Sequence, residues 1–338
     1  MGVNINLIPG DYITYNSKYI SDVNNSTFEV YWKSLGASAY GYANDLEIVE
    51  YASGIRANML RNLFEDTGAY SQNFLALLYG FDTDYNQFLL DRVSRLGVSH
   101  LFVVSGFHIA LFYIFMEKIG FKLTNNRRVI NIISTFISFI FTFFIYFPLT
   151  AVRALLTIII VRTHRFNKID SLSICGILFF IINPFIMISN SMILSFSITY
   201  VIYLLSSGPN NFKKTILISV AAFYVSLPTI TTWTTDLNLL APLVSFLITQ
   251  IVSFSYVMGL IIFPFHFLWW IGNIYFMLFD LLILLISCLY IPLTFPESNI
   301  IKQCIGTSLI IMYIVLMRGN ITILLNTLFL MSFIFFII

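Results

Sequence analysis

Charged residues are scarce in this chain. Asp, Glu, Lys and Arg together make up 10% of the 338 residues, whereas apolar residues make up 58%. Soluble domains carry about 25% charged and about 45–50% apolar residues. The composition therefore excludes an ordinary water-soluble domain and is that of an integral membrane protein.

Cysteine and histidine are also rare. The three cysteines lie in or beside apolar runs without a CxxC spacing, and they are Cys175, Cys288 and Cys304. The four histidines form no HxH or HExxH motif. The sequence thus predicts neither a disulfide framework nor a zinc site, and no cofactor is expected.

The few charges are unevenly distributed. Residues 1–100 hold eleven of the 16 acids but only six of the 18 Lys and Arg. The N-terminus has no basic region followed by an apolar one, so no signal peptide is predicted. An acidic head therefore precedes a basic membrane body, whose cations are expected to mark cytoplasmic loops.

The head is expected to have two parts. Residues 1–54 contain short β-like pieces such as "YITYNSKYI" and "LEIVEY", separated by turn residues such as Pro9-Gly10-Asp11. Residues 55–98 show helical spacing in segments too short to cross a bilayer. We predict a small α+β head followed by an amphipathic helical segment.

Residues 99–338 are expected to form an all-α polytopic membrane domain. They divide into about ten apolar segments, interpreted as transmembrane or re-entrant helices, near 101–119, 129–147, 149–161, 171–188, 192–207, 214–230, 239–263, 267–293, 303–317 and 321–338. Segment 149–161 reaches only about 20 Å as a helix, against the ~30 Å of a bilayer core. It is either half of a tight hairpin around Pro148 or a broken span.

The basic residues predict the orientation. Four clusters fall on one side if every segment crosses, and they are Lys122/Arg127/Arg128, Arg162/His164/Arg165/Lys168, Lys213/Lys214 and Arg318. Because cytoplasmic loops are enriched in Lys and Arg, this side should be the cytoplasm. The loops near 148–150, 229–238 and 294–301, the head and the C-terminus are then outside.

The stretch "GVSHLFVVSGFHIALF" (97–112) places polar residues within an apolar run. Ser105 and His108 are three residues apart, so they share a helix face. A Ser/His hydrolase is one interpretation, but no third group or oxyanion loop is evident. The alternatives are a packing hydrogen bond without further function, and a wet interior faced by Ser105 and His108, with Gly106 permitting close helix packing or a local break.

Arg153, in "PLTAVRALLTIIIV", is the most unusual charged residue. A mid-helix arginine costs roughly 2.5–3.5 kcal/mol on insertion scales. Its side chain could snorkel to the outer interface, because Pro148 is only about 7.5 Å away along the axis. Otherwise it contacts an anionic cargo or pairs with Asp280, the one acid deep in a later span.

These stretches carry a family resemblance. "GVSHLFVVSGFHIALF" resembles the signature helix of the ComEC-type competence family, whose members carry transforming DNA across the bacterial cytoplasmic membrane. "LTAVRALLTIIIVRTHRF" resembles the family's arginine-bearing helix, and Asn183-Pro184 and Leu194–Phe196 resemble two of its later motifs. "LPTITTWTTDLNLLAPLVSF" is similar to a further segment, and residues 9–51 more weakly resemble the second half of an OB-like domain.

The resemblance implies a channel component that imports single-stranded DNA during natural transformation. An external DNA receptor and a cytoplasmic ATP-driven motor are implied as partners, and a homo-oligomer is one arrangement considered. Larger members carry a metallo-β-lactamase-like domain, but the sequence has no His/Asp metal cluster of that kind, so no enzyme activity is expected. The rivals are a secondary transporter with helices broken at Gly106, Pro148 and Pro184, and the Ser/His hydrolase.

The predicted channel-lining or functional polar residues follow from these motifs. They are His100, Ser105, Gly106, His108, Arg153, Asn183, Ser195 and Asp280.

Overall fold

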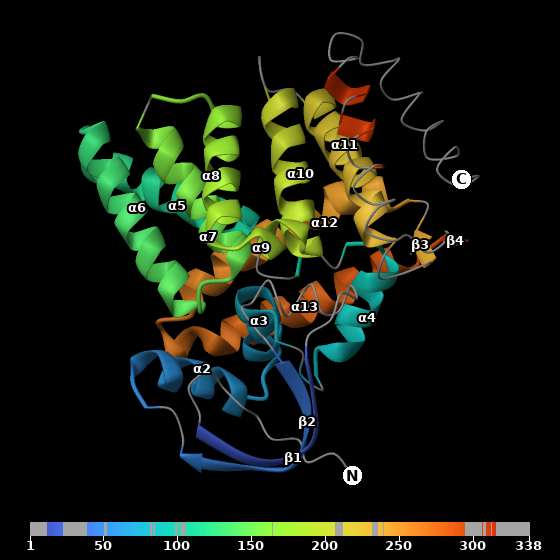
Figure 1. Cartoon of the computed structure of the whole chain (residues 1–338). Coiled ribbons are helices and arrows are strands. Elements are labelled where there is room, and N and C mark those ends of the chain that lie inside the picture. Colours follow the sequence, from blue (N-terminus) through green and yellow to red (C-terminus); the bar gives the residue numbers. More distant parts are fainter. Residues whose placement is uncertain are drawn as a thin grey trace.

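A computed structural model of the chain shows a mainly helical protein (Figure 1). It describes residues 12–22, 39–50, 53–81, 83, 85–98, 101–102, 106–163, 165–206, 212–231, 236–238, 240–294, 306, 309–311 and 313–315. In the first two ranges it describes the backbone alone.

The N-terminal part begins with two long strands. Strand β1 (Tyr12–Asp22) pairs with β2 (Ala39–Glu50) in an antiparallel sheet with three register shifts. Three helices follow: α2 (Ile55–Glu65), α3 (Ala69–Tyr79) and α4 (Gln87–Arg95). Two paired strands are common to many β folds, so the partial OB-like head stays a prediction.

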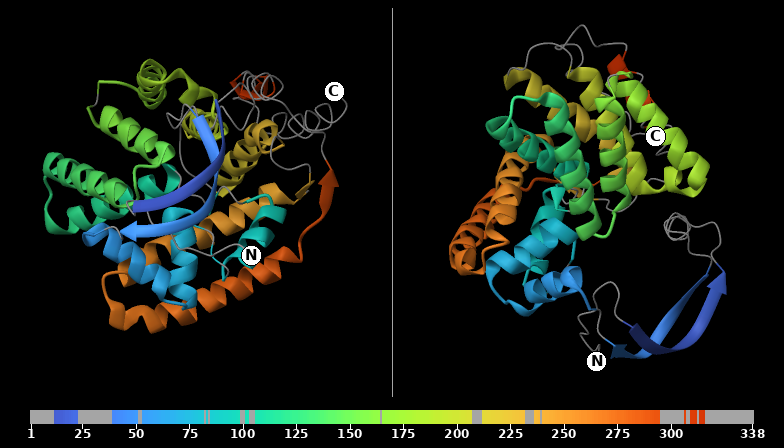
Figure 2. Two further views of the ribbon diagram at one scale, coloured as in Figure 1. Left: turned by 60° about the horizontal axis from the view of Figure 1, so that its bottom comes forward. Right: turned by 90° about the vertical axis from the view of Figure 1, so that its left-hand side faces the viewer.

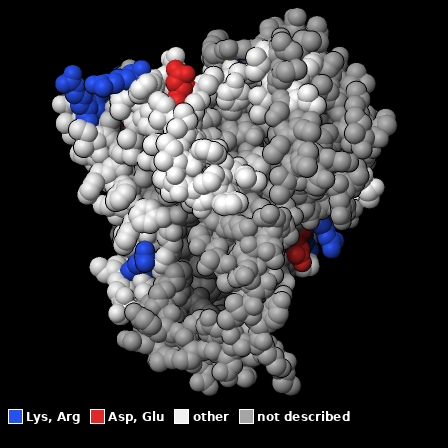
Figure 3. All heavy atoms as spheres, in the orientation of Figure 1, with Lys and Arg blue, Asp and Glu red and all other residues white. Residues whose placement is uncertain are grey.

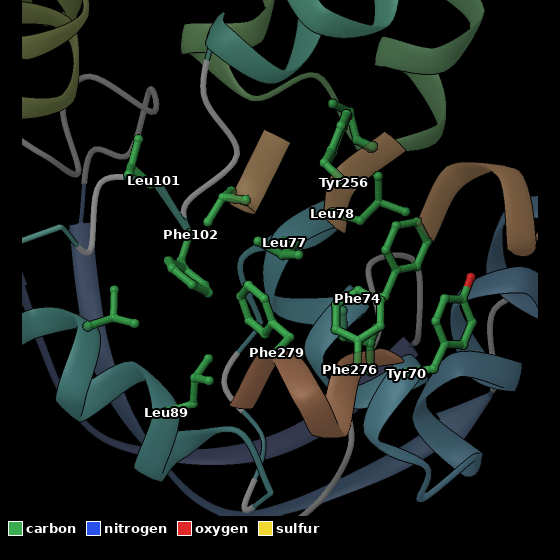
Figure 4. Packing of buried hydrophobic residues seen from close by; sticks show 14 of the residues in the cluster. Tyr70, Phe74, Leu77, Leu78, Leu89, Leu101, Phe102, Tyr256, Phe276 and Phe279 are labelled. Atoms are coloured by element: carbon green, nitrogen blue, oxygen red, sulfur yellow. The ribbon is translucent and has the colours of Figure 1, made fainter. Parts of the chain in front are cut away.

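Helix α3 is the centre of the largest apolar core (Figure 4). Every residue from Ala69 to Leu78 is buried, although the sequence of this segment suggested an amphipathic helix. It packs against α12 (Ala241–Ile262) and α13 (Trp269–Ser287), as both views of Figure 2 also show for α13. The segment before the apolar body thus shares one core with it.

Two glycines allow this close packing. A Cβ at Gly259 would lie 2.5 Å from the ring of Phe74, and a Cβ at Gly272 would lie 2.8 Å from the ring of Tyr70. The Tyr70 hydroxyl also donates a hydrogen bond to the Gly259 carbonyl at 2.9 Å. Small residues at helix contacts let backbones approach, which is the usual basis of association between helices in a membrane.

The body helices follow the predicted apolar segments. They are α5 (Gly106–Leu123), α6 (Arg127–Phe144), α7 (Leu149–Arg162), α8 (Lys168–Ile182), α9 (Pro184–Ile188), α10 (Asn190–Leu205), α11 (Phe212–Ile230), α12, the 3₁₀ turn η2 (His266–Leu268) and α13. Among the described residues, three helices are long and apolar enough to cross a membrane: Arg127–Phe144, Ala241–Ile262 and His266–Ser287. The predicted class, a helical membrane protein, is therefore supported. The predicted number of about ten spanning or re-entrant helices is not confirmed.

A tight turn joins α6 to α7. Tyr146 and Phe147 both have positive φ, 63° and 51°, which is rare for residues other than glycine and reverses the chain within a few residues. The two helices pack together. Segment 149–161 is thus half of a tight hairpin around Pro148, one of its two predicted forms.

The Asn183-Pro184 motif breaks the next helix. Pro184 occupies the first turn of α9, and the Asn183 side chain accepts a hydrogen bond from the Phe185 amide at 3.0 Å. Proline has no N–H to continue the ladder of α8 but suits the start of a new helix. The predicted segment 171–188 is therefore two helices, α8 and α9.

The loops separate by charge. The basic ends of α5/α6, α7/α8 and α10/α11 lie together at the top of Figure 1. Two of the loops predicted to lie on the opposite side meet each other, because β3 (Asp236–Asn238) pairs with β4 (Pro292–Thr294). The basic ends thus lie together as predicted, but the turn between α12 and α13, which the same prediction places with them, packs against α3 at the other end, where the Phe263 and Phe74 ring centroids are 5.8 Å apart.

The N-terminal helices contact the group of loops that lacks basic clusters. The Arg56 guanidinium of α2 lies 3.9 Å from the ring centroid of Tyr146 and donates to the Phe143 carbonyl at 3.3 Å. Helix α4 also packs against β3. The head helices therefore lie at the end opposite the basic loops.

Candidate functional site in the helical body

Arg153 lies inside the helical body. Its side chain projects from α7, and the residue is only 4% exposed. Its Nη1 donates to the Thr199 hydroxyl of α10 at 2.9 Å, and its guanidinium carbon lies 5.8 Å from the ring centroid of Phe196. The guanidinium is therefore held inside the bundle, and the snorkelling interpretation is wrong.

Gly106 provides the space for this guanidinium. A Cβ at position 106 would collide with Nη2 of Arg153 and would lie 3.0 Å from the Cβ of Ala154. Helix α5 packs closely against α7 at this point. The glycine that stands out in the sequence is thus explained by a cation on the neighbouring helix.

The charge of Arg153 is not compensated within the described part of the chain. No described Asp or Glu forms an ion pair with it, and its Nε has no hydrogen-bond partner there. A buried charge in a membrane is normally paired or faces a polar cavity. Among the described residues, the site is therefore a cationic position without a paired anion.

The predicted pair of Arg153 with Asp280 is wrong. Asp280 accepts hydrogen bonds from Nδ2 of Asn73 at 3.0 and 3.1 Å, and from the Tyr85 hydroxyl at 3.2 Å. Burial, with the nearby Asp280 carboxylate, raises the pKa of Tyr85 to about 12, so its phenol keeps its proton and donates at neutral pH. Asp280 thus ties α13 to the α3–α4 region, away from α7.

His108 faces a different neighbour from Gly106. The two residues are two positions apart on α5, which is roughly 200° around a helix. His108 is fully buried, and its ring centroid lies 4.5 Å from that of Tyr256 on α12. Gly106 and His108 therefore belong to two separate contacts, one with α7 and one with α12, rather than to one lining.

The remaining predicted residues fall into three groups. Asn183 caps α9, as described above, and Ser195 is half-buried on α10, one turn before Thr199. Residues four apart share a helix face, so Ser195 lies on the side of α10 that faces Arg153. His100 and Ser105 lie outside the described residues, so the proposed Ser105–His108 pair is outside them too.

Sequence reasoning missed several partners of Arg153. Besides Thr199, the Thr157 hydroxyl donates to the Arg153 carbonyl at 2.8 Å, and the Cys175 thiol approaches the same oxygen at 3.6 Å. The spacing of Thr157, four residues after Arg153, was a usable signal for this bond. Thr199 and Cys175 are on other helices, and no sequence spacing relates them to α7.

Comparison with known proteins gives one match. The sequence model of a family described as "Competence protein" matches residues 77–333, which is most of the chain and includes every site residue predicted from the sequence. No curated protein and no solved structure matches the chain significantly.

Proposed function

The chain belongs to the competence protein family, and from this premise we propose that it forms the core of a channel for single-stranded DNA. The channel would carry the strand across the bacterial cytoplasmic membrane during natural transformation. The family match and the long apolar helices identify a membrane protein with a role in competence. The transported strand and the channel itself are what the proposal adds.

The buried guanidinium of Arg153 carries the proposal. Every nucleotide of the cargo brings one negative phosphate, which a path through lipid must neutralise. Arg153 offers a cation that no described carboxylate neutralises, at a junction of α5, α7 and α10. A passing phosphate would supply the missing anion, and the hydroxyl of Thr199 would hold the guanidinium in place.

The distribution of charge supports a direction of transport. We propose that the basic ends of the helices face the cytoplasm, and that the head, the β3–β4 loops and the C-terminus face outward. About ten helices, some of them re-entrant, would then form the membrane domain. A negative strand would move toward the basic end.

The proposal requires partners. An external receptor would deliver the DNA, and an ATP-driven motor in the cytoplasm would pull the strand, because the family implies both roles. Second copies of the chain could complete the wall of the path. The proposal gives the chain itself no catalytic step.

The test is DNA uptake by variants at position 153 in a transformable host that depends on this protein. Labelled DNA that becomes DNase-resistant should fall sharply for Arg153→Gln, whereas Arg153→Lys should retain part of the uptake because a phosphate contact needs the charge more than the planar fork. Binding of duplex DNA at the cell surface should persist in both variants.

The matched control is Arg95→Gln, at an exposed position of α4, which also removes one positive charge. Each variant is scored beside its amount in the membrane. Normal internalisation by Arg153→Gln at normal abundance would contradict the phosphate contact, and with it the role proposed for this site.

A further inference from the structure

The tip of the α5–α6 hairpin carries an exposed group of cations. Lys118 and Lys122 lie near the end of α5, and Arg127 and Arg128 begin α6. All four are exposed. Figure 3 shows Lys and Arg atoms gathered at its upper left, over this tip.

The hairpin holds these cations in a fixed arrangement. Only three residues separate the helices, and the Asn126 side chain accepts hydrogen bonds from the Arg128 and Val129 amides at 3.1 and 3.4 Å. A Cβ at Gly120 would lie 2.9 Å from Ile130, so the two helices are in close contact just below the turn. The cations are thus presented by a preorganised turn.

No acid of the described residues pairs with these cations. The sequence has no Asp or Glu between Lys118 and Ile169, and the preceding acid, Glu117, is engaged by Arg162 at 2.9 Å. Among the described residues, the four tip cations form no ion pair.

Two other cations at this end have protein partners. The Lys214 ammonium donates to the Ser206 carbonyl at 2.9 Å, and the Lys168 ammonium lies 5.9 Å from the Tyr203 ring centroid. Arg165, between α7 and α8, is exposed and also has no partner among the described residues, but the α5–α6 tip holds the largest described group of unengaged cations at this end.

Arg127 and Arg128 do not stabilise the N-terminal turn of α6, so helix stability does not explain why they are there. The N-terminal turn of a helix carries partial positive charge, which favours acids and disfavours cations. This turn contains no acid. Arg127 and Arg128 therefore lower the stability of α6 by themselves, and an external anion would reverse the effect.

An exposed apolar surface continues from the cations. Leu123 is 81% exposed at the turn, and Ile132 and Phe136 are 69% and 62% exposed on α6, one of the three candidate membrane-spanning helices. The buried side of α6 carries Ser134, Ser138 and Thr142 instead. Helix α6 is thus apolar outward and polar inward, as a lipid-facing helix is.

We infer that the α5–α6 tip binds the phosphate groups of anionic phospholipids. Cations at the end of a lipid-facing apolar stripe lie at the depth of the headgroups. The tip lies at the outer edge of the bundle, at the far left of Figure 1, so a lipid fits it better than a strand that leaves the centre of the body. The inference stands independently of DNA transport.

The test uses the full chain in nanodiscs made with phosphatidylcholine and a titrated fraction of phosphatidylglycerol. Lipids that remain bound after release into detergent are counted by native mass spectrometry. The variant Lys122→Gln/Arg127→Gln/Arg128→Gln removes three tip cations. The control Arg61→Gln/Arg92→Gln/Arg95→Gln removes three cations from α2 and α4, at the opposite end.

The wild type and the control should retain phosphatidylglycerol in preference to phosphatidylcholine. The tip variant should lose about fivefold in preference for each cation removed, and higher salt should weaken binding in the wild type. An unchanged preference in a folded tip variant would overturn the inference. So would a tip variant that binds lipid normally but no longer binds a single-stranded oligonucleotide, because the surface would then be one for nucleic acid.

Discussion

The Nη2 atom of Arg153 occupies the position where a side chain at residue 106 would begin. The position of the Arg153 side chain therefore depends on the absence of a side chain at Gly106, although 47 positions separate the two residues. A methyl group at position 106 must displace either the guanidinium or helix α7.

We therefore predict that Gly106→Ala moves Arg153 and reduces DNA internalisation. Overpacking a close helix contact typically lowers the free energy of unfolding by about 1–3 kcal/mol. The matched control is Gly176→Ala in α8, where the nearest atom, on Phe196, is at an ordinary contact distance of 3.4 Å. Thermal unfolding in detergent and labelled-DNA uptake should both separate the two variants. Equal behaviour would mean that the Gly106 contact is not tight.

Orientation can be checked with single cysteines in a chain whose native cysteines are replaced. Cysteines at Asn125 and Asn167 lie at the basic end and should resist an impermeant thiol reagent in intact cells. Cysteines at Asn58, on α2, and Thr294, on β4, should react. All four sites are exposed, and all should react after permeabilisation. Protection of Asn58 and Thr294 in intact cells would reverse the proposed orientation.

Arg153 and Asp280 should behave independently in stability measurements. They have separate partners, Thr199 for the arginine and Asn73 with Tyr85 for the aspartate. The losses in unfolding free energy of Arg153→Gln and Asp280→Asn should therefore add within about 0.5 kcal/mol in the double variant. Asp280→Asn should couple instead with Asn73→Ala, because these side chains share hydrogen bonds. A double variant that is more stable than Arg153→Gln alone would indicate that the two charges interact.

The sequence predicted the helical segments well where apolar runs end at proline or at basic residues. The predicted segments 129–147 and 149–161 correspond to α6 and α7, because Pro148 and the flanking arginines limit both. Hydropathy gave the depth of Arg153 and Asp280 but not the direction in which each side chain points. Their pairing was inferred from depth alone and failed for this reason.

Helix α3 was misread for a related reason. Ser71, Gln72 and Asn73 look like a solvent-facing side, yet all three are buried. Ser71 and Gln72 donate to the Asp66 carbonyl, and Asn73 donates to Asp280. Buried polar groups are tolerated when they are hydrogen-bonded. Their partners come from the preceding turn and from a helix about 200 residues later, and no local pattern shows the second kind.

The contact between His108 and Tyr256 leads to a prediction about which of the two polar groups stabilises the fold. The Tyr256 hydroxyl is buried and has no hydrogen-bond partner among the described residues. Tyr256→Phe removes this hydroxyl but keeps the ring against His108 and Phe141. Since an unsatisfied buried hydroxyl costs about 1–3 kcal/mol, the variant should be as stable as the wild type or more stable. His108→Ala removes the ring itself from a fully buried position and should lower the unfolding free energy by about 2–4 kcal/mol.

Thermal unfolding of the two variants in the same detergent gives the comparison, and DNA uptake by Tyr256→Phe should stay normal. A large loss of stability in Tyr256→Phe would mean that its hydroxyl has a bonding partner in the folded protein, and that the α5–α12 contact is held by a polar network rather than by ring packing.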